Sequence, residues 1–243
     1  MKKTQRVLFL VTITLGFLSA CSNTSSSNSN DISSKTSSHQ GMTCIAPNIY
    51  VDPEMPKQQQ QQFLQTVKHS RANISRFFGG MKSSPNIYAC STKSCFSKFG
   101  GVPAKAKAID DNKVLLSSRA LNQTTLTHEL AHVEFHKRLG TPHLWHKIPM
   151  WFDEGLAVLA CKDQSYSKSV AKMPLNKLVS QDQWVDAVRN NKPAYNVARQ
   201  AVEKWYRGVG TQGLQALIFR MQKGEEFSLD SRSNVNVRLA AAK

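Results

Sequence analysis

The segment 125–139 carries His128 and His132 four positions apart, within the motif HELAH, and this spacing constrains the chain more than any other feature. Apolar residues of the segment, among them Leu126 and Leu130, recur at the spacing of a helix. Positions four apart lie one turn above each other on the same helical face, so the rings of His128 and His132 can reach a single ion. The pattern therefore predicts a helix whose histidine face takes part in a metal site.

Zinc is the metal that this pair of histidines favours. It takes imidazole nitrogens at about 2.0–2.1 Å, so His128 and His132 fill two corners of a tetrahedron. Glu129 points about 100° away around the helix and is poorly placed to bind the same ion. It can instead contact a water at the open corner, which is the place of a general base. Histidines that only pack in the core or face solvent are the alternative, which the paired spacing disfavours.

A catalytic zinc site has three protein ligands and leaves its fourth position to water, so a third ligand is needed. His136 continues the same helical face, but it lies about 12 Å beyond His128 along the axis, too far to share the ion. Arg138 stands where the extended metzincin motif has its third histidine, which excludes that pattern. The third ligand is therefore expected from another segment.

Glu154, in the helical pattern 150–161, is the remaining source of this ligand. It follows His132 by 22 residues, enough for one helix to end at Gly140 and for the next to return antiparallel. A carboxylate placed there can meet both imidazoles. The adjacent Asp153 is another possible ligand.

The motifs HELAH at 128–132 and WFDEGLA at 151–157 resemble those of the gluzincin zinc metallopeptidases, in particular bacterial peptidase MA-like lipoproteins. The similarity covers about 85–229 and is strong only at the two motifs. It implies zinc as the cofactor. It also implies that His128, His132 and Glu154 bind the zinc. Glu129 is then the catalytic base.

The resemblance also implies a zincin-like active-site helix preceded by an edge strand, and 113–117 fits that strand. Two residues of the family pattern are not identified in this sequence, namely the residue that supports the first histidine and the donor to the oxyanion. The best-known gluzincins have an Asp four residues after the ligand Glu that supports the first histidine, but this position is Val158 here. The donor to a developing oxyanion is also open. Its candidates are Tyr195, Tyr206, His143 and His146.

The remaining patterns predict an α+β fold. Strand patterns come first, at 43–51, 86–90, 104–109 and 113–117, the last two forming a hairpin around an Asp-Asp-Asn turn. Helical patterns lie at 57–78, 125–139, 150–161, 181–189, 197–206 and 212–222. This order predicts a small antiparallel or mixed N-terminal sheet with helices on one side, and a mostly helical C-terminal half.

The first 20 residues are typical of a secretory signal peptide. Three basic residues precede an apolar run of twelve residues, too short for a bilayer core, which takes about 20. The closing Leu18-Ser19-Ala20-Cys21 resembles the lipobox of bacterial lipoproteins, in which the cysteine receives a lipid. We therefore expect membrane anchoring through Cys21 in the bacterial cell envelope. An ordinary signal peptide with an unrelated cysteine is the alternative.

The predicted organisation has four parts. They are a signal peptide at 1–20, a lipidated cysteine with a flexible Ser/Asn-rich tether at 21–41, a zincin-like domain at 42–230 and a disordered tail at 231–243. In similar lipoproteins a serine after the cysteine, here Ser22, accompanies sorting to the outer membrane, facing the periplasm.

Four cysteines follow Cys21. An exported chain meets an oxidising compartment, so an even number favours disulfides, with three possible pairings. The preferred pairing joins Cys90 to Cys95 across a short loop and Cys44 to Cys161.

The formal net charge is +16, or +13 once the three basic residues of the leader are removed. This excess favours anionic partners such as lipid headgroups, envelope polymers or acidic substrates. The export signal and the lack of a nucleic-acid motif argue against nucleic acid.

Together these features predict a membrane-anchored zinc peptidase that acts on peptide or protein substrates of the cell envelope. The alternatives are a non-catalytic zinc-binding lipoprotein and a lipoprotein that binds envelope polymers.

Overall fold

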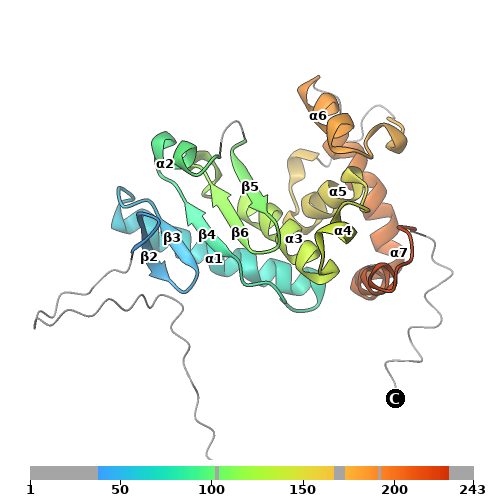
Figure 1. Ribbon diagram of the computed structural model, residues 1–243, viewed down its shortest axis with the longest axis horizontal. Helices are drawn as coiled ribbons and strands as arrows, with labels where there is room; N and C mark the ends of the chain where they lie inside the picture. Colours follow the sequence, from blue (N-terminus) through green and yellow to red (C-terminus); the bar gives the residue numbers. More distant parts are fainter. Residues whose placement is uncertain (1–37, 102–103, 167–172, 191–192, 230–243) are drawn as a thin grey trace, which may run out of the picture.

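The computed structural model describes residues 38–101, 104–166, 173–190 and 193–229. A mixed sheet forms the N-terminal end of the molecule and helices form the other end, which confirms the α+β class (Figure 1). None of the helices in these ranges combines the length and apolar character that crossing a membrane requires. The predicted signal peptide, Cys21 and the tail at 231–243 lie outside the described residues.

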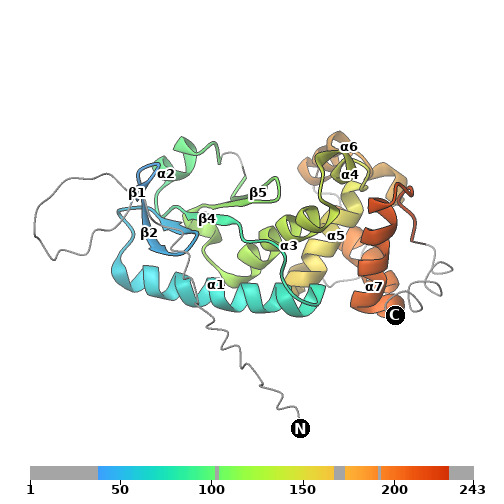
Figure 2. The same ribbon diagram turned by 60° about the horizontal axis from the view of Figure 1, so that its bottom comes forward.

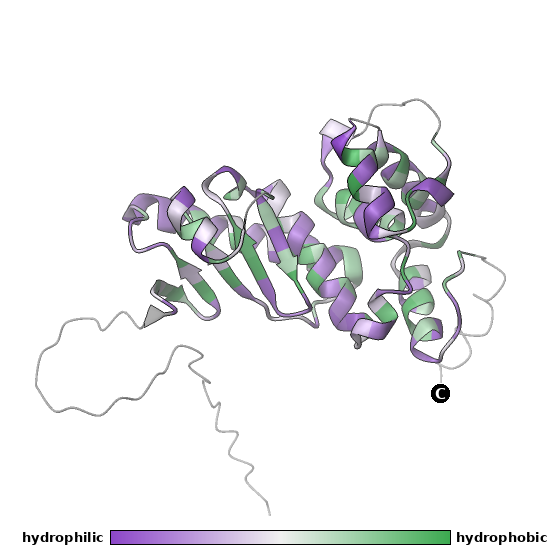
Figure 3. Ribbon diagram, turned by 45° about the horizontal axis from the view of Figure 1, so that its top comes forward, coloured by the Kyte–Doolittle hydropathy of each residue, from purple (hydrophilic) through white to green (hydrophobic). Residues whose placement is uncertain are grey.

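The sheet has six strands in the order β1-β2-β3-β4-β6-β5. Their bounds are β1 Ser38–His39, β2 Met42–Ala46, β3 Ile49–Val51, β4 Asn86–Ala89, β5 Ala106–Ile109 and β6 Lys113–Leu116. The central strands β3, β4 and β6 run parallel, and the remaining pairs are antiparallel. Figure 3 shows hydrophobic residues along the middle of these strands, where β4 and β6 are buried.

Three strand predictions need correction. The single strand expected at 43–51 is the hairpin β2–β3, because Asn48 adopts a left-handed conformation (φ 63°) that asparagine tolerates and that turns the chain. The expected edge strand 113–117 corresponds to β6, which lies inside the sheet, while β5 folds back to form the edge. Strand pairing also begins at Ser38, within the predicted tether, because β1 pairs with β2.

Helix α1, Lys57–Phe78, has the predicted bounds and runs along one face of the sheet (Figure 2). Its buried apolar residues recur every three to four positions, which sets one helical face into the main core. The helix ends at Gly79 in a left-handed conformation (φ 71°), as a glycine C-cap does.

The opposite face of the sheet carries a helix that the sequence patterns did not indicate. Helix α2, Lys93–Lys98, places Phe96 in a small second core with Tyr50, Tyr88 and Leu115. Its six residues are too few for a recognisable period. The predicted disulfide between Cys90 and Cys95 is confirmed, with Cα atoms 5.5 Å apart, and it ties α2 to the end of β4.

The C-terminal part consists of helices, as predicted. Their bounds are α3 Gln123–Leu139, α4 Pro142–Trp145, α5 Met150–Cys161, α6 Gln181–Arg189 and α7 Ala194–Gln222. Helix α3 begins after Asn122, whose side chain accepts a hydrogen bond from Thr125 N. The two helices expected at 197–206 and 212–222 correspond to the two parts of α7, which are separated at Gly210, where the backbone leaves helical geometry (φ 60°, ψ −161°).

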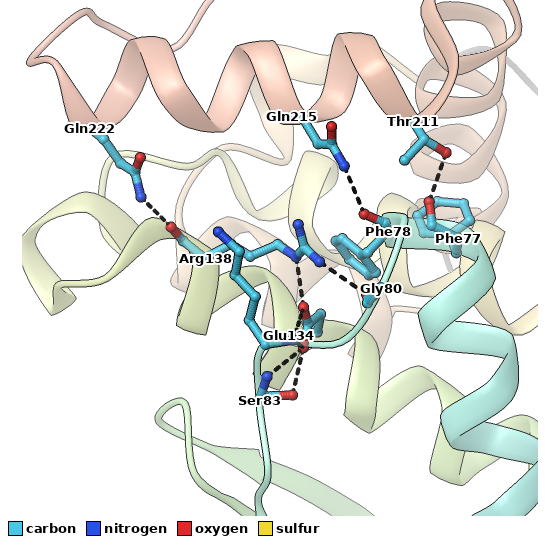
Figure 4. A network of polar contacts seen from close by, with 10 residues as sticks. Phe77, Phe78, Gly80, Ser83, Glu134, Arg138, Thr211, Gln215 and Gln222 are labelled. Atoms are coloured by element: carbon cyan, nitrogen blue, oxygen red, sulfur yellow. Dashed lines mark hydrogen bonds and ion pairs between the residues drawn. The ribbon is translucent and has the colours of Figure 1, made fainter. Parts of the chain in front are cut away.

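A buried ion pair fixes α3 to the chain after α1 (Figure 4). The Glu134 carboxylate, which is fully buried, accepts hydrogen bonds from Arg138 Nε, Lys82 N, Ser83 N and Ser83 Oγ. Arg138 also donates to Gly80 O. Because each charged group has several partners, the pair holds the helix that bears the histidines in place.

Helices α5 and α7 approach closely at Gly155. A Cβ atom at this position would lie 2.5 Å from Ala198 O and 2.8 Å from Val202 Cγ2. We therefore expect Gly155→Ala to lower the free energy of unfolding by about 1–3 kcal/mol in urea denaturation, because the helices must separate. Gly208→Ala is the control, since its Cβ would meet no described atom within 4 Å. This change should be neutral or stabilise by up to about 1 kcal/mol, and equal losses for both variants would contradict the close approach.

Candidate metal centre

Helices α3 and α5 pack against each other and bring three donor atoms together. Nε2 of His128 lies 3.1 Å from Nε2 of His132. Oε2 of Glu154 lies 3.3 Å from the first of these nitrogens and 3.7 Å from the second. The two histidines and the glutamate singled out in the sequence therefore converge, and they form a buried or half-buried cluster that could hold a metal ion.

The distances within this cluster fit a tetrahedral ion. Ligands about 2.0–2.1 Å from a tetrahedral centre are separated from each other by about 3.3–3.4 Å, close to the three separations found here. Oε2 of Glu154 is buried, and its polar neighbours among the described residues are the two histidine nitrogens, at 3.3 and 3.7 Å. A cation between the three atoms would satisfy this oxygen.

Asp153 does not face the cluster as a ligand. Its Oδ1 lies 2.9 Å from Nδ1 of His132, and its Oδ2 lies 3.0 Å from Nε2 of His136. Asp153 thus contacts the side of the His132 ring that faces away from His128. His136 is likewise engaged outside the cluster, in agreement with its exclusion as a ligand on distance.

The carboxylates around the two rings favour positive charge. Burial acts against the charged form of His132, but Asp153 and Glu154 outweigh it and raise its pKa to about 9. Burial also opposes charge on His128, yet hydrogen bonds and the charge of Glu154 raise its pKa well above the usual value. Burial would raise the pKa of Asp153, but the histidines that it contacts lower it far below its ordinary range. The cluster is therefore a negative pocket suited to a cation.

Cys161 lies beside the cluster, where sequence reasoning did not place it. It is a buried free thiol in the described part of the chain, so the predicted pairing with Cys44 is wrong. The thiol donates to Val158 O at 3.4 Å and is hydrogen-bonded with the His128 side chain. Its position seven residues after Glu154 puts both on one face of α5, and this spacing was the signal available in the sequence.

Glu129, next to His128 on α3, is partly exposed. Its charge acts on both His128 and Tyr195, so its carboxylate lies close to the cluster without belonging to the three converging donors.

The four candidate oxyanion donors lie at different distances from the cluster. The Tyr195 ring centre lies 6.4 Å from that of His128, and the charge of Glu154 acts on its hydroxyl. The Tyr206 hydroxyl instead donates to Phe77 O at 3.0 Å. His143 and His146, on and just after α4, are exposed. Tyr195 is therefore the candidate placed beside the cluster.

Comparisons of the chain with protein-family models, with curated proteins and with solved structures found no match.

Proposed function

We propose that the protein is a zinc-dependent peptidase of the gluzincin type. The observation that supports this most strongly is the convergence of His128, His132 and Glu154 at tetrahedral separations, with Glu129 beside them. Two imidazoles and one carboxylate are a ligand set of catalytic zinc sites. A site that only stabilises the fold has no use for the additional carboxylate of Glu129.

The proposed reaction is hydrolysis of an amide bond. A zinc ion held by His128, His132 and Glu154 would act as a Lewis acid and would lower the pKa of water. The Glu129 carboxylate accepts the proton of the attacking water and later delivers it to the leaving amine. His128, His132 and Glu154 stay fixed on two packed helices, so the reacting groups need little reorganisation.

Tyr195 is the proposed donor to the oxyanion that forms at the scissile carbonyl. Burial and the charge of Glu154 raise the pKa of its hydroxyl well above the usual value, although a hydrogen bond with Trp184 acts the other way. The hydroxyl therefore keeps its proton and can donate it in a hydrogen bond.

Tyr195→Phe should lower kcat about 100–1,000-fold and leave zinc affinity unchanged, because a donor is lost while the ligands remain. Steady-state peptide hydrolysis and zinc titration would measure the two effects. Tyr206→Phe is the matched control, since its hydroxyl bonds to Phe77 O, and it should keep a near wild-type kcat. A Tyr195→Phe enzyme with undiminished kcat would remove this residue from the reaction.

We propose peptides or proteins of the bacterial cell envelope as substrates. The signal peptide and lipobox pattern supports a lipoprotein anchored through Cys21, in the outer membrane facing the periplasm. The net positive charge would hold the protein near anionic headgroups or draw acidic substrates. Nucleic acid is not a proposed partner.

Zinc quantification beside cleavage of a peptide library tests this function. The purified protein should contain about one zinc per chain and cleave peptides, and His132→Ala should lose both properties. Zinc binding without turnover on any peptide would instead support a non-catalytic zinc-binding lipoprotein. Binding of anionic glycan that persists after chelation, with no zinc bound, would support a protein that binds envelope polymers.

A further inference from the structure

We infer that Asp153, held by His136, is a positioning residue for the ligand His132. The inference rests on the proposed function in that it requires a metal at the cluster of His128, His132 and Glu154. It assigns the supporting role that the family pattern would give to position 158, where this chain has a buried valine.

The hydrogen bonds of Asp153 determine which nitrogen of His132 is free. An ionised carboxylate only accepts hydrogen bonds, so Nδ1 of His132, at 2.9 Å, must carry a proton that it donates to Oδ1. With the Nδ1 proton held by Asp153, Nε2, the atom that faces His128 and Glu154, is the nitrogen that a metal can take in place of a proton. Asp153 thus sets both the tautomer and the orientation that a metal ligand needs.

His136 holds Asp153 from the other side. Its Nε2 lies 3.0 Å from Oδ2 of Asp153, so the carboxylate spans two histidines that are one turn apart on α3. The His136 ring stacks on Trp145, with centres 4.9 Å apart and planes 13° apart. Nε1 of Trp145 donates to His136 O at 2.9 Å. Helix α4 therefore backs the ring that fixes the carboxylate.

Asp153 is also placed by its neighbour in the chain. It lies in the first turn of α5 and comes directly before Glu154, so two adjacent residues supply a ligand and the support of another ligand. A shift of α5 along α3 would disturb both contacts together.

Asp153→Asn should weaken zinc binding about 10–100-fold. An asparagine offers one acceptor and one donor group and cannot accept from both histidines. His136→Phe should cause a smaller, several-fold loss, because phenylalanine can keep the stacking on Trp145 but frees Oδ2 of Asp153. Competition with a chromogenic chelator measures the dissociation constants on purified full-length protein, with no need for activity.

The double variant distinguishes positioning from general support of the fold. If His136 acts through Asp153, adding His136→Phe to Asp153→Asn should change the zinc dissociation constant no further. His143→Ala, an exposed histidine on the same helix as Trp145, is the control and should bind zinc like the wild type.

The outcomes separate this inference from the proposed function. A wild-type protein without zinc affinity would overturn both. If Asp153→Asn binds zinc within twofold of the wild-type affinity, the positioning role is overturned and the proposed function is not. This holds even if the variant is less stable to heat. If Asp153→Asn does not fold, His136→Phe is the variant that tests the inference. Unchanged zinc affinity in His136→Phe would then overturn it.

Discussion

Glu129→Gln should retain wild-type zinc affinity and hydrolyse peptides about 100–10,000-fold more slowly. The amide cannot accept the proton of the attacking water, whereas the three converging donors, on His128, His132 and Glu154, are untouched. A fall in kcat with unchanged metal content is the signature of a lost general base. Peptide cleavage followed by mass spectrometry, beside metal analysis of the same sample, measures both quantities.

Glu54→Gln is the control for this experiment. Glu54 is exposed near the start of α1, far along the chain from the cluster, and its replacement should leave kcat unchanged. Full activity of the Glu129→Gln variant would refute the role of Glu129, since no other described group would have been altered.

Arg138→Met should lower the free energy of unfolding by about 3–5 kcal/mol. The change leaves the Glu134 carboxylate buried without its charged partner, and an uncompensated buried charge is costly. Urea denaturation should show a lower midpoint with an unchanged slope. The loss should appear in metal-free protein as well, because the pair lies apart from the cluster.

Lys137→Met is the matched control for Arg138→Met. Lys137 is the preceding residue on α3 and pairs with Asp111 at 3.1 Å, but its side chain is about half exposed. Pairs of this kind contribute about 0–1 kcal/mol. Similar losses for the two variants would show that burial of the Glu134–Arg138 pair does not matter to stability.

The helices longer than two turns were predictable because each shows an apolar period. The bounds predicted for α1 are those observed, and Gly79 marks its end. The departures lie where short segments or single backbone conformations decide the structure. The left-handed Asn48 splits one expected strand into two. The six-residue α2 is too short to show a period.

The three converging side chains could be predicted for a physical reason. Helical spacing alone places His128 and His132 on one face, and a short connection returns Glu154 to it. The surroundings depend on side-chain rotamers and on how α3 packs against α5, which spacing does not determine. Asp153 therefore looked like a second possible ligand, although it contacts the outer nitrogen of His132.

The cysteines show the same limit of sequence reasoning. Cys90 and Cys95 are close in sequence, and their pairing followed from a short loop. Cys161 was paired by counting cysteines and by compartment, but it lies as a free thiol beside His128. The pairing of cysteines far apart in the sequence cannot be predicted without the three-dimensional fold.

The most direct test of the central claim is an anomalous difference map, recorded at the zinc absorption edge, from crystals of the protein purified with zinc. The account predicts one peak within about 2.0–2.2 Å of His128 Nε2, His132 Nε2 and Glu154 Oε2. A zinc-saturated crystal with no peak there, or with Glu154 turned away from the ion and no other protein ligand in its place, would contradict it.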